Sequence, residues 1–300
     1  MDISNELVKQ QKKVQTNNHI KYRKLKDSIF HAAIFCVTCI GIVILFVLIA
    51  DILTKGLPWL SKQFFTGFPS RFPHKSGILP GILGSLYIIA LTVVFAVPVG
   101  LGCAIYLEEY AKNNWLTKFI KINISNLSGT PAIVYGLLGL TVFVRTLALK
   151  KSILSGALTM SLVVLPIVIV ASQEAIKAVP QFLRHGSYAL GATKWQTIRK
   201  VVLPTAFPGI LTGVILSVSR ALGESAPLIM VGAATFVSFL PKGIMDNFTA
   251  LPMQIYYWTG LPKAEFRELA AAGIIVLLAL LLTTNAAAIV LRNKFQKSVE

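Results

Sequence analysis

Two opposite charges, Arg220 and Glu224, lie four residues apart in the largely apolar sequence SVSRALGESAPL at residues 217–228. In a helix this spacing places both side chains on one face. Counting about 1.5 Å per residue from Thr205 puts Arg220 roughly 23 Å along a membrane helix, beyond the bilayer centre. Charged groups at that depth are costly, face the interior of a helix bundle and by default mark a substrate pathway.

The chemistry of this pair favours an anion as the substrate. A guanidinium stays protonated at physiological pH, and its planar fork matches the oxygens of phosphate or carboxylate. We therefore expect Arg220 to attract an anion, and Glu224 to hold and neutralise Arg220 when no anion is bound. An ion pair that only joins two helices is the structural alternative.

A charged stretch at residues 188–204, YALGATKWQTIRKVVLP, has the pattern of two short helices joined at a glycine. Pro180 suits the first turn of the first helix, because its missing N–H costs nothing there. Gly191 ends that helix, since glycine enters a left-handed turn most easily. Thr193 and Gln196 have the spacing of a capping box, which predicts the start of the second helix.

The second short helix is predicted to be amphipathic. Trp195, Ile198 and Val202 share one face, and the basic residues lie elsewhere on its surface. A rigid polar projection of this kind on a membrane protein is suited to being held by another protein. An ordinary amphipathic surface helix is the simpler interpretation of the same pattern.

The rest of the sequence does not indicate catalysis or metal binding. It has no Gly-x-x-x-x-Gly-Lys-Ser/Thr loop, so we do not expect the chain to bind ATP itself. Its 4 histidines lie in separate segments without metal-ligand spacing, and its 12 acidic residues form no recognisable catalytic set. Cys36 and Cys39 form a C-x-x-C inside an apolar run, where we expect packing residues. We expect no cofactor, and a protein that moves or binds something and is not an enzyme.

These residues must be positioned by membrane helices, because the mean hydropathy is +0.70 and 55% of the residues are hydrophobic. Apolar runs of about 20 residues or more predict an all-α membrane protein with six transmembrane helices. The runs are Ala32–Ala50, Ser76–Leu107 (spanning from about Ile82 to Tyr106), Ile122–Val144, Ser152–Gln173, Val201–Ser219 with its continuation past Arg220, and Leu269–Leu291. The expected organisation is a basic tail at 1–30, a transmembrane domain at 31–292 with a loop at about 174–204, and a tail at 293–300.

The placement of Lys and Arg predicts the topology, since cytoplasmic loops retain these residues. Of the 29, 18 lie on the side that holds both tails and the Gly191 loop, and 10 lie on the other side. Both termini and the loop are therefore expected in the cytoplasm. The formal charge of +17 does not indicate nucleic-acid binding, because the basic residues are spread over two sides of a membrane. The basic N-terminal segment suits contact with anionic lipid.

The Gly191 loop resembles the cytoplasmic coupling loop of ABC-importer permease subunits. In that family the loop reads Glu-Ala-Ala, three residues, Gly, nine residues, then Ile-x-Leu-Pro. Gly191 stands at the glycine, and Val201, Leu203 and Pro204 form the ending. Residues 185–187, His-Gly-Ser, depart from the Glu-Ala-Ala opening. The resemblance implies that the following residues contact an ATPase: Ala189, Leu190, Gly191, Ala192, Thr193 and Trp195.

Three further strings are similar to the permeases of the high-affinity phosphate importer. They are RALGESAPL at residues 220–228, SGTPAIVYGLLGL at 128–140 and FTALPMQIYYW at 248–258, the last of which favours the A-type subunit. The resemblance implies the type I importer permease fold in a bacterial inner membrane. It also implies a second permease chain in a heterodimer, two ATPase subunits that bind ATP, and an extracytoplasmic phosphate-binding protein.

The implied function is that of a permease subunit, which forms the translocation pathway and transmits ATPase motion through the coupling loop. A permease for another oxyanion, such as sulfate or molybdate, would share the coupling loop but not all three strings. An ion-coupled secondary transporter would also carry buried charges, but usually shows inverted repeats that this sequence lacks. A membrane scaffold or sensor would leave Arg220 and Glu224 unexplained.

Overall fold

The computed structural model describes residues 2–233 and 236–296. By their contacts the residues fall into two units, Met1–Thr54 and Lys55–Glu300. The first unit is formed by helix α1 (Asp2–Gly56), which ends just inside the second. Within the described residues the regular structure is helical, apart from one isolated antiparallel bridge between Ser152 and Asn247. The predicted all-α class is confirmed.

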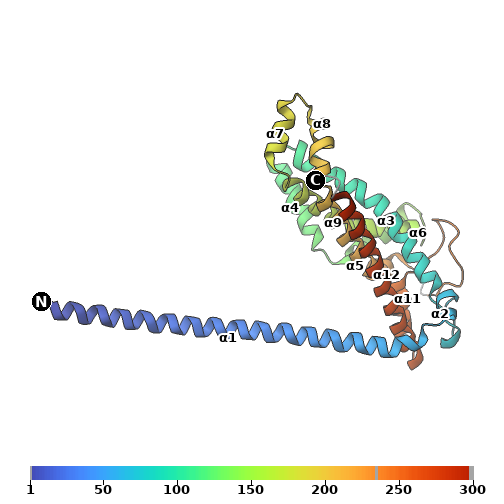
Figure 1. Ribbon diagram of the computed structural model, residues 1–300. Coiled ribbons are helices and arrows are strands. Elements are labelled where there is room, and N and C mark those ends of the chain that lie inside the picture. Colours follow the sequence, from blue (N-terminus) through green and yellow to red (C-terminus); the bar gives the residue numbers. More distant parts are fainter. Residues whose placement is uncertain (1, 234–235, 297–300) are drawn as a thin grey trace. The chain divides into compact units, whose positions relative to one another are not determined.

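The second unit is built on four long helices: α3 (Leu79–Ile105), α6 (Ile153–Lys177), α9 (Leu203–Gly223) and α12 (Ala264–Gln296). The shorter α-helices are α2 (Lys62–Thr66), α4 (Trp115–Ser128), α5 (Ala132–Gly139), α7 (Gln181–Ala189), α8 (Lys194–Thr197), α10 (Ala226–Val231) and α11 (Leu251–Thr259). Three π-helical turns, η3 (Tyr106–Tyr110), η4 (Leu140–Thr146) and η5 (Ile198–Val202), and two 3-10 turns, η1 (Leu57–Trp59) and η2 (Pro73–Lys75), complete it. In Figure 1, α7 and α8 lie at one end of this unit, away from α2 and α11.

Five helical segments in the described ranges are long and apolar enough to cross a membrane. They are Lys26–Trp59, Leu79–Tyr110, Ile153–Lys177, Lys194–Gly223 and Ala264–Lys294. A sixth span results if Trp115–Ser128 and Ala132–Thr146 are taken as one, although they are bent by 102°. The predicted set of six spans therefore holds, with one of them broken.

The third span, predicted as a continuous run from Ile122 to Val144, is the broken one. Helix α4 ends at Ser128, and α5 begins at Ala132 after Pro131. Proline lacks an N–H and disfavours the helical conformation of the residue before it, so the break lies where the sequence reads Gly-Thr-Pro. The Tyr135 hydroxyl donates a hydrogen bond to the Leu127 carbonyl across the bend, at 2.8 Å. The bend leaves Ser128 at the end of α4, beside the pocket described below.

The fifth span begins earlier than predicted. Helical structure continues from Lys194 through η5 into α9, and Pro204 lies in the first turn of α9, where proline is tolerated. The second short helix of the loop is therefore the beginning of a membrane-spanning helix. This continuous helix runs from α8 to Arg220, near the other end of α9.

Helix α6 is at the centre of the bundle and packs against α3, α5 and α9. Small residues allow the close approach: a Cβ at Gly213 of α9 would lie 2.3 Å from the Cβ of Ala171, and one at Gly100 of α3 would lie 2.8 Å from Val168. Met160, Val164 and Val168 of α6 belong to the buried core. This packing fixes the separation of α6 and α9, between which the candidate site lies.

Candidate functional site

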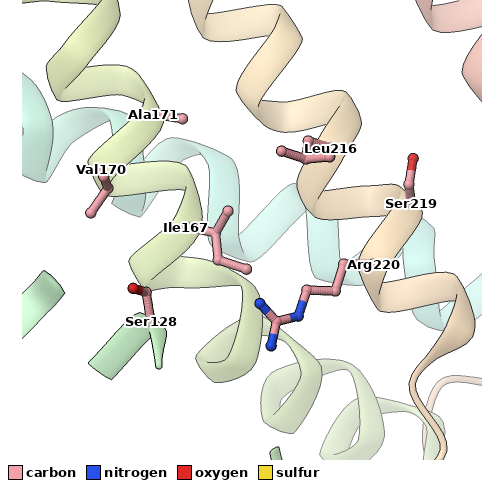
Figure 2. Close-up of a pocket in the computed structure, with 7 residues that line it drawn as sticks. All are labelled: Ser128, Ile167, Val170, Ala171, Leu216, Ser219 and Arg220. Carbon is pink, nitrogen blue, oxygen red and sulfur yellow. The ribbon is translucent and has the colours of Figure 1, made fainter. Parts of the chain in front are cut away.

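A pocket of about 660 Å³ lies between α6 and α9. It is lined by Ser128 of α4, by Ile167, Val170 and Ala171 of α6, and by Leu216, Ser219 and Arg220 of α9. Figure 2 shows the Arg220 side chain extending from α9 toward α6, with its guanidinium among apolar side chains. A guanidinium in a mostly apolar pocket is suited to bind an anion, because few polar groups compete for its N–H donors.

The predicted pairing of Arg220 with Glu224 is present, with Arg220 Nε 3.4 Å from Glu224 Oε1. The predicted helical geometry is wrong, because α9 ends at Gly223 and Glu224 has extended backbone (φ −82°, ψ 117°). The Arg220 side chain is 46% exposed and that of Glu224 24% exposed. Within the described chain Nη1 and Nη2 of Arg220 form no hydrogen bond, so they remain able to donate to a ligand.

The two serine hydroxyls that line the pocket are both engaged in hydrogen bonds within the chain. The Ser219 hydroxyl is hydrogen-bonded to Asn285 of α12 and to the Ile215 carbonyl. The Ser128 hydroxyl donates to the Ser125 carbonyl at 2.6 Å. Arg220 is thus the lining residue whose donors are most available, and the pocket is a candidate binding site for a small anion.

The Gly191 loop has the predicted hinge. Gly191 has a left-handed backbone (φ +80°) directly after α7. Its N–H donates to the Tyr188 carbonyl at 2.9 Å, and the Ala192 N–H donates to the Ser187 carbonyl at 3.2 Å. These two bonds form a Schellman motif, which satisfies the last carbonyls of the helix. Pro180 differs slightly from expectation, since it is the residue before the first turn of α7.

The predicted capping box is also present. The Thr193 hydroxyl accepts a hydrogen bond from the Gln196 N–H at 3.3 Å, and the Gln196 side chain accepts one from the Thr193 N–H at 2.8 Å. The predicted shared face of the second helix is not buried along its whole length. Ile198 and Val202 are fully buried, whereas Trp195 is half-exposed because it lies one turn before the packed part of the helix.

The loop presents large apolar side chains to solvent. Leu190 is 90% exposed, and Phe182, Tyr188 and Trp195 are also exposed. The six residues predicted to contact an ATPase all lie here: Ala189 ends α7, Leu190, Gly191 and Ala192 form the hinge, Thr193 caps α8 and Trp195 lies in α8. Exposed apolar side chains grouped on a rigid projection are typical of a protein-interaction surface.

Arg184 is the functional candidate that the sequence analysis overlooked. It was counted only as one of the loop charges, but in α7 it is buried and paired with Glu109 of η3, with Nη2 3.1 Å from Oε1. The signal available in the sequence was the pair of adjacent acidic residues, Glu108 and Glu109, directly after an apolar run in a basic chain. His185, which stands where the family has Glu, is exposed.

No group of three or more potential metal-ligating side chains occurs in the described parts of the chain. Cys36 and Cys39 are free thiols in α1. The candidate site consists of the Arg220 pocket and the Gly191 loop.

Comparisons with known proteins identify the family of this chain. Residues 96–297 match the family described as binding-protein-dependent transport system inner membrane component. The chain is 35% identical over 213 residues to the probable ABC transporter permease protein YqgI of Bacillus subtilis, covering 71% of this chain and 72% of that protein. It is 32% identical over 259 residues to the phosphate transport system permease protein PstA of Pasteurella multocida, covering 86% of this chain and 91% of that protein.

Solved structures share the fold at low sequence identity. A chain of the bacterial alginate ABC transporter in complex with a periplasmic protein matches with a TM-score of 0.65 and 15% identity, covering 88% of this chain and 93% of that chain. A chain of the MetNI methionine ABC transporter in an inward-facing conformation matches with a TM-score of 0.58 and 17% identity, covering 73% and 95%. The fold is thus the type I ABC importer permease fold.

Proposed function

The chain belongs to the family of binding-protein-dependent transport system inner membrane components, and we propose that it is the A-type permease subunit of an ATP-driven phosphate importer. The observation that carries the proposal is the position of Arg220, whose terminal N–H groups face a pocket of about 660 Å³. The importer-permease fold supports a transport function, and the phosphate permease among the relatives supports the choice of anion.

Arg220 acts as the attracting group of the translocation pathway. Its planar fork can donate two parallel hydrogen bonds to two phosphate oxygens, while the Glu224 carboxylate retains Nε. A carboxylate close to the guanidinium also keeps the phosphate from binding too tightly, and release is as necessary as binding in a transport pathway. Apart from Ser128 and Ser219 the remaining lining is apolar, so the selection of phosphate over other anions rests largely on the partner binding protein.

The proposed partners are those of the importer-permease family to which the chain belongs. ATP is bound and hydrolysed by two ATPase subunits, because the chain lacks a phosphate-binding loop. Those subunits contact the exposed side chains of the Gly191 loop, Leu190 and Trp195 among them. A second permease chain, in a heterodimer, covers the open side of the Arg220 pocket, and a binding protein delivers phosphate from outside.

The function is tested by reconstituting the chain in vesicles with its ATPase, second permease and binding-protein partners. Uptake of labelled phosphate is then measured. We expect uptake that requires ATP and the binding protein and that persists in a large excess of sulfate or molybdate. Inhibition of phosphate uptake by sulfate or molybdate at a concentration equal to that of phosphate would assign that competing anion as the substrate. Uptake that continues without ATP, but stops when ion gradients are collapsed, would indicate a secondary transporter.

The orientation in the bacterial inner membrane provides a separate prediction. Single cysteines that replace exposed Lys112 and Lys118 should react with an impermeant maleimide only after the membrane is opened. Cysteines at exposed Lys62 and Lys242 should react in intact spheroplasts. The reason is the excess of Lys and Arg on the cytoplasmic side. Labelling of Lys112→Cys from outside would overturn the assignment of both termini to the cytoplasm.

A further inference from the structure

The π-helical turn η3, with the sequence YLEEY, ends the second span and contacts several elements at once. Glu108 Oε1 lies 2.8 Å from Lys121 Nζ of α4 and accepts a hydrogen bond of 2.7 Å from Gln173 Nε2 of α6. The Tyr110 ring lies 5.0 Å from Lys194 Nζ of α8. Because consecutive residues of a helix point in different directions around its axis, three neighbouring side chains reach different elements.

The central residue of this set, Glu109, is bound to the first helix of the Gly191 loop. Its Oε1 accepts hydrogen bonds from Arg184 Nη2 at 3.1 Å and from Arg184 Nε at 3.4 Å. Little of either side chain is exposed, 9% for Glu109 and 10% for Arg184. The neighbouring pair of Glu174 and Lys177 is different, since those side chains are 66% and 47% exposed.

Arg184 also binds the end of α6. Its Nη2 donates to the Ile176 carbonyl at 2.8 Å, and its Nη1 donates to the Val179 carbonyl. The Ile176 carbonyl lies in the last turn of α6, and the Val179 carbonyl lies just after that helix. One guanidinium therefore joins the end of the second span, the end of α6 and the loop helix α7.

A buried ion pair is weak evidence for stability, because the cost of removing two charges from water offsets most of their attraction. A pair of this kind is better explained by the conformation that it specifies. The π-helical form of η3 agrees with this explanation, since single π turns within helices occur frequently at functional positions.

We propose that Glu109 and Arg184 are positioning residues that hold α7 in register with the ends of α3 and α6. A displacement of α7 by the ATPase subunit then moves both membrane helices together, while the continuous helix from α8 to α9 moves the side of the pocket that carries Arg220. The measurement of phosphate transported per ATP rests on the proposed function, whereas the measurement of amide hydrogen exchange does not.

The test uses the assembled transporter in detergent and in vesicles. Arg184→Met alone leaves Glu109 buried and without its partner, so a loss of assembly is expected. The double variant Glu109→Met with Arg184→Met removes both charges and is expected to assemble. In that variant we expect amide hydrogen exchange in residues 181–189 to become about tenfold faster, with α9 unchanged, because α7 has lost its anchor. We also expect phosphate transported per ATP hydrolysed to fall several-fold.

Glu174→Gln is the matched control, because it removes an exposed ion pair at the same end of α6. It should change neither exchange in α7 nor the amount of phosphate per ATP. Arg184→Lys retains the charge but has fewer directed donors for the two carbonyls, so intermediate exchange is expected. If the double variant does not assemble, Arg184→Lys decides by the same measurement.

The positioning role is rejected if hydrogen exchange in α7 of the double variant is as slow as in the wild type. If the double variant does not assemble, the same result in Arg184→Lys rejects it. An unchanged ratio of phosphate to ATP in the double variant rejects it as well. A wild-type complex that imports no phosphate would reject the proposed function alone. The exchange result would still decide on Glu109 and Arg184, because it needs no substrate.

Discussion

Replacement of Arg220 by Gln is expected to reduce phosphate uptake by the assembled transporter about ten- to a hundredfold. Hydrogen bonds to a charged group contribute about 1.5–3 kcal/mol, and each 1.4 kcal/mol corresponds to about a factor of ten. Arg220→Lys should keep partial activity, because the charge remains but the two parallel donors are lost. Glu224→Gln should be milder, since an amide oxygen can still accept from Nε. Initial rates of labelled phosphate uptake measure all three.

If the pair only stabilised the structure, its removal would change the assembly of the transporter and not uptake by the assembled complex. The Arg220 side chain is 46% exposed in the chain, and pairs with such exposure contribute about 0–1 kcal/mol, so little loss of assembly is expected from either single change. Arg292→Gln is the matched control, because Arg292 also lies against α9, with Nη1 3.3 Å from Thr212 Oγ1, but does not line the pocket. Near wild-type uptake by the double variant Arg220→Gln with Glu224→Gln would remove both residues from the pathway.

Gly191→Val is expected to separate ATP hydrolysis from transport. The left-handed backbone at φ +80° strains a residue with a side chain by about 1–2 kcal/mol, more for a β-branched one, which lowers the population of the hinged loop about tenfold. The membrane helices should still fold, since no other atom lies within 4 Å of a Cβ at this position. The measurement is the amount of phosphate imported per ATP hydrolysed.

The loop offers a matched pair of glycines for this test. Gly186 lies inside α7, and a Cβ there also meets nothing within 4 Å. Gly186→Ala should therefore leave coupling unchanged and stabilise α7 by about 0.5–1 kcal/mol, whereas Gly191→Ala should impair coupling. Gly191→Asn should be tolerated better than Gly191→Ala, because Asn enters the left-handed region more readily. Equal coupling in Gly186→Ala and Gly191→Ala would show that the hinge conformation is not required.

Features that depend on a few neighbouring residues were predictable from the sequence. The Gly191 turn and the Thr193–Gln196 capping box have the predicted geometry. The all-α class and the positions of the apolar spans follow from hydropathy over windows of about 20 residues. Such features are local because backbone preference and membrane partitioning are properties of short segments.

Errors arose where tertiary packing or a helix end changes a local pattern. The four-residue spacing of Arg220 and Glu224 predicted one helical face, but α9 ends at Gly223, and the side chains meet across the helix end. The apolar run from Ile122 to Val144 predicted one transmembrane helix, but two helices bent by 102° lie on either side of the Gly-Thr-Pro sequence. Periodicity placed Trp195 on one face with Ile198 and Val202, but only the packing shows that burial begins at Thr197 and leaves Trp195 exposed.

The sequence by itself determined that the chain is a helical membrane protein with a glycine-hinged loop and a charged pair at the end of its fifth span. Only the tertiary structure placed Arg220 in a pocket between α6 and α9, and only it joined Glu109 to Arg184, which lie 75 residues apart. The physical reason is that hydropathy and backbone preference act within a segment. The partner of a buried charge is selected by the packing of segments far apart in the chain, and neither residue alone indicates which one it will meet.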